Sequence, residues 1–170
     1  MAGLIGALIA ALLLIVAIWG LTRFQDRDVA SPAPAVDFAA ELATAREQAP
    51  FPVLAPRPVP DGWRATSVSW DGAGPEVAWH LGFVTGAGSD AAYVGVEQGN
   101  APAAEFVAAH TPADLPADPV DIGGARWRAL TSDGDETALY RTAADGATTL
   151  VTGTLPEAEL VAFVESLSPR

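Results

Sequence analysis

Alternating apolar and polar positions dominate the chain from residue 63 onward and predict a series of short β-strands. In the segment VAWHLGFVT, residues 77–85, every second residue from Val77 to Phe83 is apolar and falls on one face, as a half-buried strand requires. Segments of the same kind, separated by turns rich in Gly, Pro and Asp, are predicted at 63–70, 91–98, 120–122, 125–131, 137–143 and 147–154. Because strand follows strand across short turns, we expect a mainly antiparallel sheet.

Three segments have the periodicity of helices instead. Residues 37–48 place Phe38 and Leu42 on one stripe, and a short helix is predicted at 102–111. A last helix follows Thr154 to Glu157, which match the capping-box pattern, and its apolar stripe runs to Leu167. The sequence therefore predicts an α+β fold in which the helices pack on one face of the sheet.

The first 22 residues, MAGLIGALIAALLLIVAIWGLT, contain no charged side chain. As a helix rising about 1.5 Å per residue, such a segment spans the roughly 30 Å of a bilayer's hydrocarbon core. We expect residues 1–22 to be an uncleaved transmembrane anchor, with the lipid bilayer as its partner. A cleaved signal peptide is the alternative, but no basic stretch precedes the apolar run, and the best small-x-small triplet, Ala33-Pro34-Ala35, lies well beyond it.

The rest of the chain divides into two parts. Residues 23–49 are predicted to be a spacer and a juxtamembrane helix, and residues 50–168 an α+β soluble domain. The domain begins with a segment rich in proline, which excludes a helix there and favours an extended path. Arg23 and Arg27 follow the span, and positive-inside counting would place the domain in the cytoplasm, but a bias of two arginines leaves the orientation open.

Charge and cysteine content exclude several function classes. The formal net charge is −12, and such an acidic chain is repelled by nucleic acid, so we expect no nucleic-acid partner. The chain has no cysteine, which excludes disulfides, thiol catalysis and thiolate metal sites.

No catalytic, metal or nucleotide motif stands out. His80 and His110 are the only histidines, and neither has an acidic or hydroxyl residue at diagnostic spacing. The run Asp133 to Glu136 looks like the start of a calcium loop, but its glycine comes second and no ladder of ligands follows in register. We therefore expect no enzyme activity, no cofactor and no metal.

Aromatic residues on the predicted strands are the best candidates for a binding surface. An open sheet face that carries some of them could bind a ligand or a partner protein. The alternative is that the tryptophans form the core under the helices. The candidate residues are Trp70, Trp79, His80, Tyr93, Trp127 and Tyr140.

Four strings of the sequence carry a family resemblance: FPVLAPRPVPDGWR, VAWHLGFVT, DIGGARWR and TTLVTGTLPEAELVAFVESL. Together they resemble the mainly actinobacterial family called domain of unknown function 4245. The resemblance implies a single-pass protein of the cytoplasmic membrane with its domain on the extracytoplasmic side. It implies no activity, substrate or site residue.

We therefore expect an envelope-facing domain that binds a protein or another envelope component without catalysis. A small-molecule sensor with an apolar pocket between helix and sheet is one alternative. A hydrolase of envelope polymers, acting through a pair of loop carboxylates, is the other.

Overall fold

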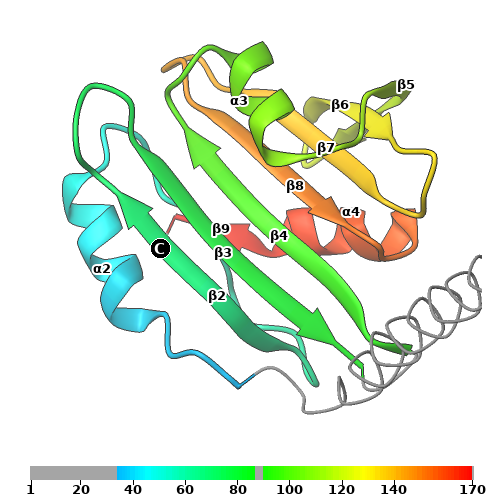
Figure 1. The fold of residues 1–170 in the computed structure, drawn as a ribbon, viewed down its shortest axis with the longest axis horizontal. Coiled ribbons are helices and arrows are strands. Elements are labelled where there is room, and N and C mark those ends of the chain that lie inside the picture. The colour runs from blue at the N-terminus through cyan, green and yellow to red at the C-terminus, as the bar shows by residue number, and fades with distance from the viewer. Residues whose placement is uncertain (1–33, 87–89, 170) are drawn as a thin grey trace, which may run out of the picture. The chain divides into compact units, whose positions relative to one another are not determined.

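The computed structural model describes residues 34–86 and 90–169. Within them, seven strands form one sheet in the order β2-β3-β4-β8-β7-β6-β5, and every neighbouring pair is antiparallel (Figure 1). This confirms the predicted α+β fold with a mainly antiparallel sheet. The strands are β2 Arg64–Asp71, β3 Ala78–Thr85, β4 Ala92–Gly99, β5 Leu115–Ile122, β6 Ala125–Thr131, β7 Thr137–Thr142 and β8 Thr148–Gly153.

The main core lies between one face of this sheet and two helices, α2 (Ala39–Gln48) and α4 (Glu157–Ser166). Trp79, Leu81 and Phe83 of β3 are all 0% exposed, which confirms the alternation predicted for this strand. Phe163 of α4 packs edge-on against Phe83, with ring centroids 6.0 Å apart. The apolar face of β3 thus organises the main core.

The third helix, α3 (Ala103–His110), packs on the opposite face of the sheet. Its Phe106 joins Leu150 of β8 and Ala138 of β7 in a second, smaller apolar cluster. Figure 1 shows α3 in front of the sheet and α4 behind it. The expectation that the helices share one face is therefore wrong, because β8 is buried on both of its faces and its Leu150 offers α3 an apolar contact.

The proline-rich segment after α2 forms a two-residue strand, β1 (Ala55–Pro56), that pairs with β9 (Leu167–Ser168) at the C-terminal end. The extended path predicted for this segment is confirmed. The last helix ends at Ser166, so Leu167 belongs to this strand pair and not to the helical stripe predicted for it.

One strand is longer than the sequence predicts. The pattern favours a loop before Val120, whereas β5 begins at Leu115 and includes Pro116 and Pro119. Proline cannot donate to a ladder of hydrogen bonds, so it disfavours a central strand. Here β5 is the last strand of the sheet, and a strand with only one neighbour tolerates prolines.

The capping box predicted for the last helix does not form. The N-cap residue of α4 is Pro156, and it makes no side-chain capping bond. The Thr154 hydroxyl instead accepts a hydrogen bond from the Tyr93 N–H at 3.2 Å, and the Thr154 N–H donates to the Tyr93 carbonyl at 3.0 Å. Thr154 therefore fixes the backbone of Tyr93 at the start of β4.

Across residues 34–86 and 90–169, no helix is long and apolar enough to cross a membrane. The anchor predicted at residues 1–22 lies outside the described residues, as does the spacer up to residue 33.

Candidate functional site

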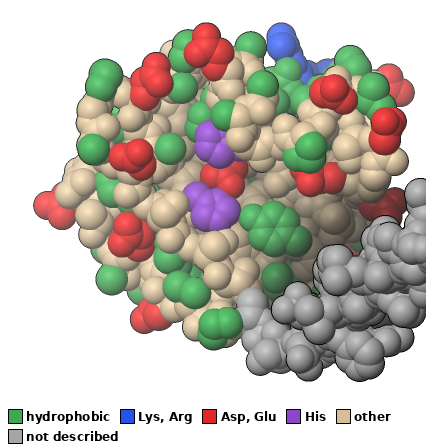
Figure 2. Space-filling view, viewed as in Figure 1, with side chains coloured by type: hydrophobic (Ala, Val, Ile, Leu, Met, Phe, Trp, Pro, Cys, Tyr) green, Lys and Arg blue, Asp and Glu red, His purple; other side chains and the backbone are tan. Residues whose placement is uncertain are grey.

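Strands β2, β3 and β4 present one face that is open over most of its length (Figure 1). Helix α3 reaches only its end, where Phe106 packs against Ala78 and Gly99. Figure 2 looks onto this open face and shows two histidine side chains, the only two in the sequence, with an acidic side chain between them. Pairing of the three strands places six side chains or glycines together on the open face: Ser67, His80, Gly82, Tyr93, Gly95 and Glu97.

Three of these side chains form a continuous hydrogen-bonded relay across the three strands. The Ser67 hydroxyl lies 2.7 Å from Nε2 of His80. The other ring nitrogen of His80, Nδ1, contacts the Oε1 atom of Glu97. The side chain of His80 is 26% exposed and that of Glu97 is 10% exposed, so the carboxylate is shielded while the imidazole faces solvent. We call these residues the open-face relay.

The hydrogen-bond directions in the open-face relay follow from its acidic end. A carboxylate only accepts, so Glu97 fixes the proton of a neutral imidazole on Nδ1 of His80. Nε2 of His80 is then an acceptor, and the Ser67 hydroxyl donates to it. The relay thus holds His80 in the tautomer that can receive a proton from Ser67.

Tyr93 extends the relay at its other end. Its hydroxyl lies beside the Ser67 hydroxyl, because a Cβ atom at Gly82 would come within 2.4 Å of the Ser67 oxygen and 2.9 Å of the Tyr93 oxygen. Gly82 and Gly95 lie directly opposite each other beneath the Tyr93 ring. A Cβ atom at Gly95 would lie 2.7 Å from the Tyr93 hydroxyl oxygen, closer than van der Waals contact permits. The two glycines therefore leave the room that Tyr93 needs to reach Ser67.

The environment of Tyr93 keeps its phenol protonated. Partial burial of the side chain, which is still 38% exposed, is the main cause that raises the pKa of Tyr93 above its ordinary value of 10.0, and the negative charges of Glu97 and Glu136 raise it further. The hydrogen bond with Ser67 acts in the opposite direction. Tyr93 is therefore a hydrogen-bond donor on the open face at neutral pH.

The six residues predicted as a surface do not share one face. His80 and Tyr93 meet in the open-face relay. Tyr140 lies on the same side of the sheet but packs in the cluster under α3, with the Arg128 guanidinium 5.9 Å from its ring. The tryptophans pack in the main core on the opposite face: Trp70, Trp79 and Trp127.

The tryptophans therefore belong to the core, which was the alternative interpretation of the sequence. Trp79 is 0% exposed and donates its indole N–H to the Leu54 carbonyl at 3.1 Å. Trp70 is half-buried and donates to Gln48 at 3.0 Å. None of these indole rings belongs to the open face.

Sequence reasoning missed Ser67 and Glu97. Neither lies near His80 in the sequence, because the relay is assembled by strand pairing. Glu97 is the direct cross-strand partner of His80, and Ser67 pairs with Gly82, two residues after His80. The hairpin between 77–85 and 91–98 is the signal that could have found Glu97, once its register was known.

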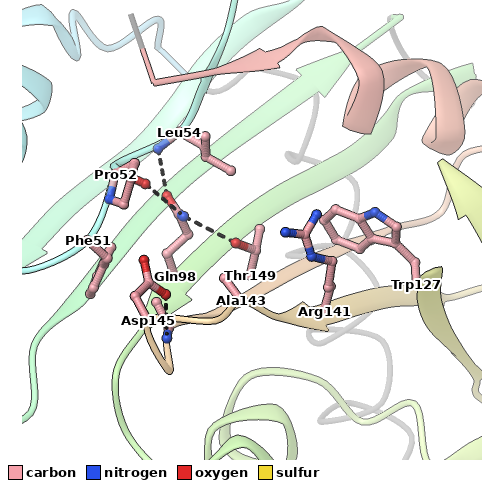
Figure 3. Close-up of a pocket in the computed structure, with 10 residues that line it drawn as sticks. Phe51, Pro52, Leu54, Gln98, Trp127, Arg141, Ala143, Asp145 and Thr149 are labelled. Carbon is pink, nitrogen blue, oxygen red and sulfur yellow. Dashed lines mark hydrogen bonds between the residues drawn. The ribbon is translucent and has the colours of Figure 1, made fainter. Parts of the chain in front are cut away.

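A separate pocket lies on the core side of the sheet, between the proline-rich segment and the hairpin of β7 and β8. It encloses about 230 Å³ and is lined by apolar residues such as Phe51 and Trp127. Figure 3 shows the Arg141 guanidinium beside the Trp127 indole, and the Gln98 amide at the opposite wall. The pocket therefore combines an aromatic wall with an exposed cation.

Gln98 holds one wall of this pocket in place. Its Oε1 atom accepts from the Leu54 N–H at 2.6 Å, and its amide nitrogen donates to the Pro52 carbonyl at 3.2 Å and to the Thr149 hydroxyl at 3.1 Å. The side chain of Gln98 is thus committed to structure, and the Asp145 carboxylate accepts from the Ala147 N–H. Arg141 is the positively charged group that lines the pocket.

A metal centre has no support within the described residues, where no group of three His, Asp or Glu side chains could hold an ion. Asp133 and Asp135 lie in the exposed turn between β6 and β7. Glu136, at the end of that turn, accepts a hydrogen bond from the Thr111 hydroxyl at 2.6 Å. This acidic turn therefore fastens the end of α3 to the β6–β7 hairpin.

Comparison with known proteins supplies a family and no activity. The family described as a protein of unknown function, DUF4245, matches residues 1–167. No curated protein and no solved structure gives a significant match. The resemblance found in the sequence is thereby confirmed, and the chain belongs to the DUF4245 family.

Proposed function

We propose that this chain is a single-pass membrane protein whose domain, on the extracytoplasmic side, binds a protein or another envelope component. One observation carries the proposal: the open face of β2, β3 and β4 holds fixed, partly buried polar groups. The uncharged run at residues 1–22 supports the anchor.

The open face suits recognition because its polar groups are already positioned. Ser67, His80 and Glu97 hold one another through hydrogen bonds, and Thr154 fixes the backbone of Tyr93. Binding to groups that are ordered beforehand costs little conformational entropy. A partner that failed to match the relay would leave polar groups unpaired on contact, which provides specificity.

Charge restricts the partner further. The chain carries a formal net charge of −12, which repels other strongly acidic molecules. A neutral or basic partner that offers hydrogen-bonding groups to the relay is the expected occupant.

Site-specific photocrosslinking in membranes tests the proposed surface. A photoreactive amino acid replaces Ser69, which is exposed on the open face beside His80, and in a control it replaces Glu47, which is exposed on α2. We expect a discrete crosslinked species from position 69 alone, lost when Ser67→Ala and His80→Gln are added. The same species from both positions, or one unaffected by the two substitutions, would exclude the open face as the binding surface.

Protease treatment of intact spheroplasts tests the proposed side of the membrane. With a C-terminal tag, we expect digestion of a full-length species. A mature species shorter by about thirty residues would show a cleaved signal peptide instead. Protection until the membrane is opened would place the domain in the cytoplasm and overturn the proposed orientation.

The pocket beside Arg141 favours a second candidate function, a sensor of a small molecule. Its volume of about 230 Å³ lies just below the range of roughly 300–1,000 Å³ of common ligand sites, so its ligand would be small. Arg141 beside Trp127 suits an aromatic carboxylate such as benzoate. A thermal shift with benzoate that Arg141→Ala abolishes would support the sensor, and an unchanged melting temperature would exclude this ligand class.

A further inference from the structure

The order of atoms in the open-face relay is that of a reactive centre. A hydroxyl lies 2.7 Å from Nε2 of an imidazole whose Nδ1 meets a carboxylate. Nucleophile, base and orienting acid are recognised by this geometry and not by their positions in the sequence. We infer that Ser67 is a nucleophile for acyl transfer from carboxylic esters, with His80 as its general base.

Glu97 is the positioning residue of this centre. It comes from β4, directly opposite His80, and it is 8% exposed. A shielded carboxylate on Nδ1 of His80 keeps the imidazole in the tautomer that accepts a proton at Nε2, and stabilises the imidazolium after transfer. The third strand thus orients the base without touching the substrate.

Tyr93 provides a donor for the negative charge that develops on the carbonyl oxygen. Its hydroxyl and that of Ser67 both lie over Gly82, where an added Cβ atom would be 2.9 Å from the Tyr93 oxygen and 2.4 Å from the Ser67 oxygen. The phenol is therefore beside the atom that an ester carbonyl would approach. A phenolic O–H is among the groups that stabilise such oxyanions. The strand register also shifts between Ala65 and Ser67, and bulges of this kind re-aim side chains next to active sites.

The reaction that fits these groups needs only an ester and water. Ser67 Oγ bonds to the carbonyl carbon while its proton passes to Nε2 of His80, and Tyr93 donates to the resulting oxyanion. The carbon–oxygen bond of the ester then breaks, and the alcohol leaves with the proton from His80. Water repeats the same steps on the acyl-serine, which releases the acid and restores Ser67.

This inference goes beyond the proposed binding function, because it assigns a covalent reaction to residues that would only form hydrogen bonds if the domain did no more than bind a partner. It also differs from the hydrolase that the sequence left as an alternative, which would act through a pair of loop carboxylates. Those carboxylates would have to flank the bond to be cleaved, whereas here a single carboxylate acts through a histidine and a serine.

Labelling of the purified full-length chain with a fluorophosphonate probe is the first test. We expect covalent labelling of the peptide that contains Ser67, and its loss in Ser67→Ala. Ser69→Ala is the matched control, because Ser69 lies on the same strand and the same face. His80→Gln and Glu97→Gln should each lower the labelling rate by at least about 100-fold. Hydrolysis of p-nitrophenyl acetate in solution and of p-nitrophenyl laurate in detergent micelles would distinguish a soluble ester from a membrane ester.

A second measurement needs no substrate and uses the absence of cysteine in the chain. Ser67→Cys and Ser69→Cys each introduce a single thiol, and Ser69 is the more exposed of the two serines. Activation by His80 predicts faster alkylation by iodoacetamide at position 67 than at position 69, by about tenfold or more. Adding His80→Gln should remove this advantage.

No labelling of folded wild-type protein, together with slower alkylation at position 67 than at position 69, would overturn the inference. A partner captured through position 69 in the crosslinking experiment, without labelling of Ser67, would keep the proposed binding function and reject the nucleophile. The experiments can therefore refute either proposal without refuting the other.

Discussion

Gly82 of β3 lies directly opposite Gly95 of β4, and the hydroxyl end of Tyr93 occupies the space above both. A Cβ atom would lie 2.9 Å from the Tyr93 hydroxyl oxygen at Gly82 and 2.7 Å from it at Gly95. Neither glycine has a positive φ, so the reason for glycine here is space and not backbone conformation. The pair is what allows Tyr93 to reach Ser67.

Gly95→Ala should therefore displace Tyr93. Gly82→Ala should displace both Ser67, whose oxygen would lie 2.4 Å from the new Cβ atom, and Tyr93. We expect each substitution to lower the free energy of unfolding by about 1–3 kcal/mol, as overpacking in a tight site does. Chemical denaturation measures this change. Gly134→Ala is the control, because a Cβ there would meet only the Ser132 hydroxyl at 3.6 Å, and its stability should be that of the wild type. Wild-type stability in all three variants would contradict the packing role of the pair.

The raised pKa of Tyr93 can be observed directly, because the chain has only 2 tyrosines. In Tyr140→Phe, Tyr93 is the sole tyrosine, and its ultraviolet titration should have a midpoint above the ordinary 10.0. The same variant unfolded in denaturant supplies the reference. Glu136→Gln should lower the folded midpoint, since the charge of Glu136 is one cause of the shift. Coincident folded and unfolded titrations would show that the ring is not shielded.

The same shift predicts a loss of stability in alkali. The folded state holds the Tyr93 proton more tightly than the unfolded state does, so the contribution of Tyr93 is present in full below the unfolded pKa. It is lost as the pH rises above about 10 and through the folded pKa. The difference between the unfolding free energies of the wild type and of Tyr93→Phe, measured over this alkaline range, should therefore become smaller as the pH rises.

The fold was predictable from the sequence where each signal is local. Alternation in residues 77–85 correctly identified the buried face of β3, because a strand with one buried face needs apolar residues at every second position. The same rule could not identify β5 from Leu115, since prolines hide a strand at the edge of a sheet. It also could not show that β8, half of whose residues are threonines, is buried on both faces, and so it did not place α3 on the face opposite the other two helices.

The open-face relay was not predictable because it depends on register between strands. Moving a strand by one residue reverses the face of every side chain on it, so the meeting of His80 with Glu97 requires the correct pairing of β3 and β4. Ser67 further depends on the register shift beside Ala65. The sequence did identify His80 and Tyr93 as candidates, but it did not identify Ser67 and Glu97, the residues that contact His80.

Gln98 should be among the most sensitive polar residues of the core. It is 2% exposed, and Gln98→Leu would leave the Leu54 N–H and the Pro52 carbonyl without their partners. Buried groups left unpaired cost about 1–3 kcal/mol, so we expect a loss of that size in chemical denaturation. Gln48→Leu, which removes an exposed bond to Trp70, is the control and should cost about 0.5 kcal/mol or less. Equal losses would mean that the proline-rich segment is held by other contacts.

Glu41 of α2 should protect the free edge of the sheet. Strand β2 is the outermost strand on this side, and the Glu41 carboxylate accepts a hydrogen bond from the Trp70 N–H at 3.2 Å. Near the other end of β2, the Val36 N–H donates to the Ala65 carbonyl at 2.8 Å. These two contacts occupy backbone groups that would otherwise be available to pair with a strand of another molecule.

Glu41→Ala should therefore have two effects, whereas Glu41→Gln should have neither because the amide oxygen still accepts. We expect a loss of about 1 kcal/mol in the free energy of unfolding and a concentration-dependent self-association, measured by sedimentation, as the edge becomes free to pair. Glu47→Ala, an exposed substitution on the same helix, controls for the loss of one negative charge. If Glu41→Ala and Glu47→Ala behave alike in both measurements, the carboxylate acts only through charge, and the edge of β2 is protected by the packing of α2 itself.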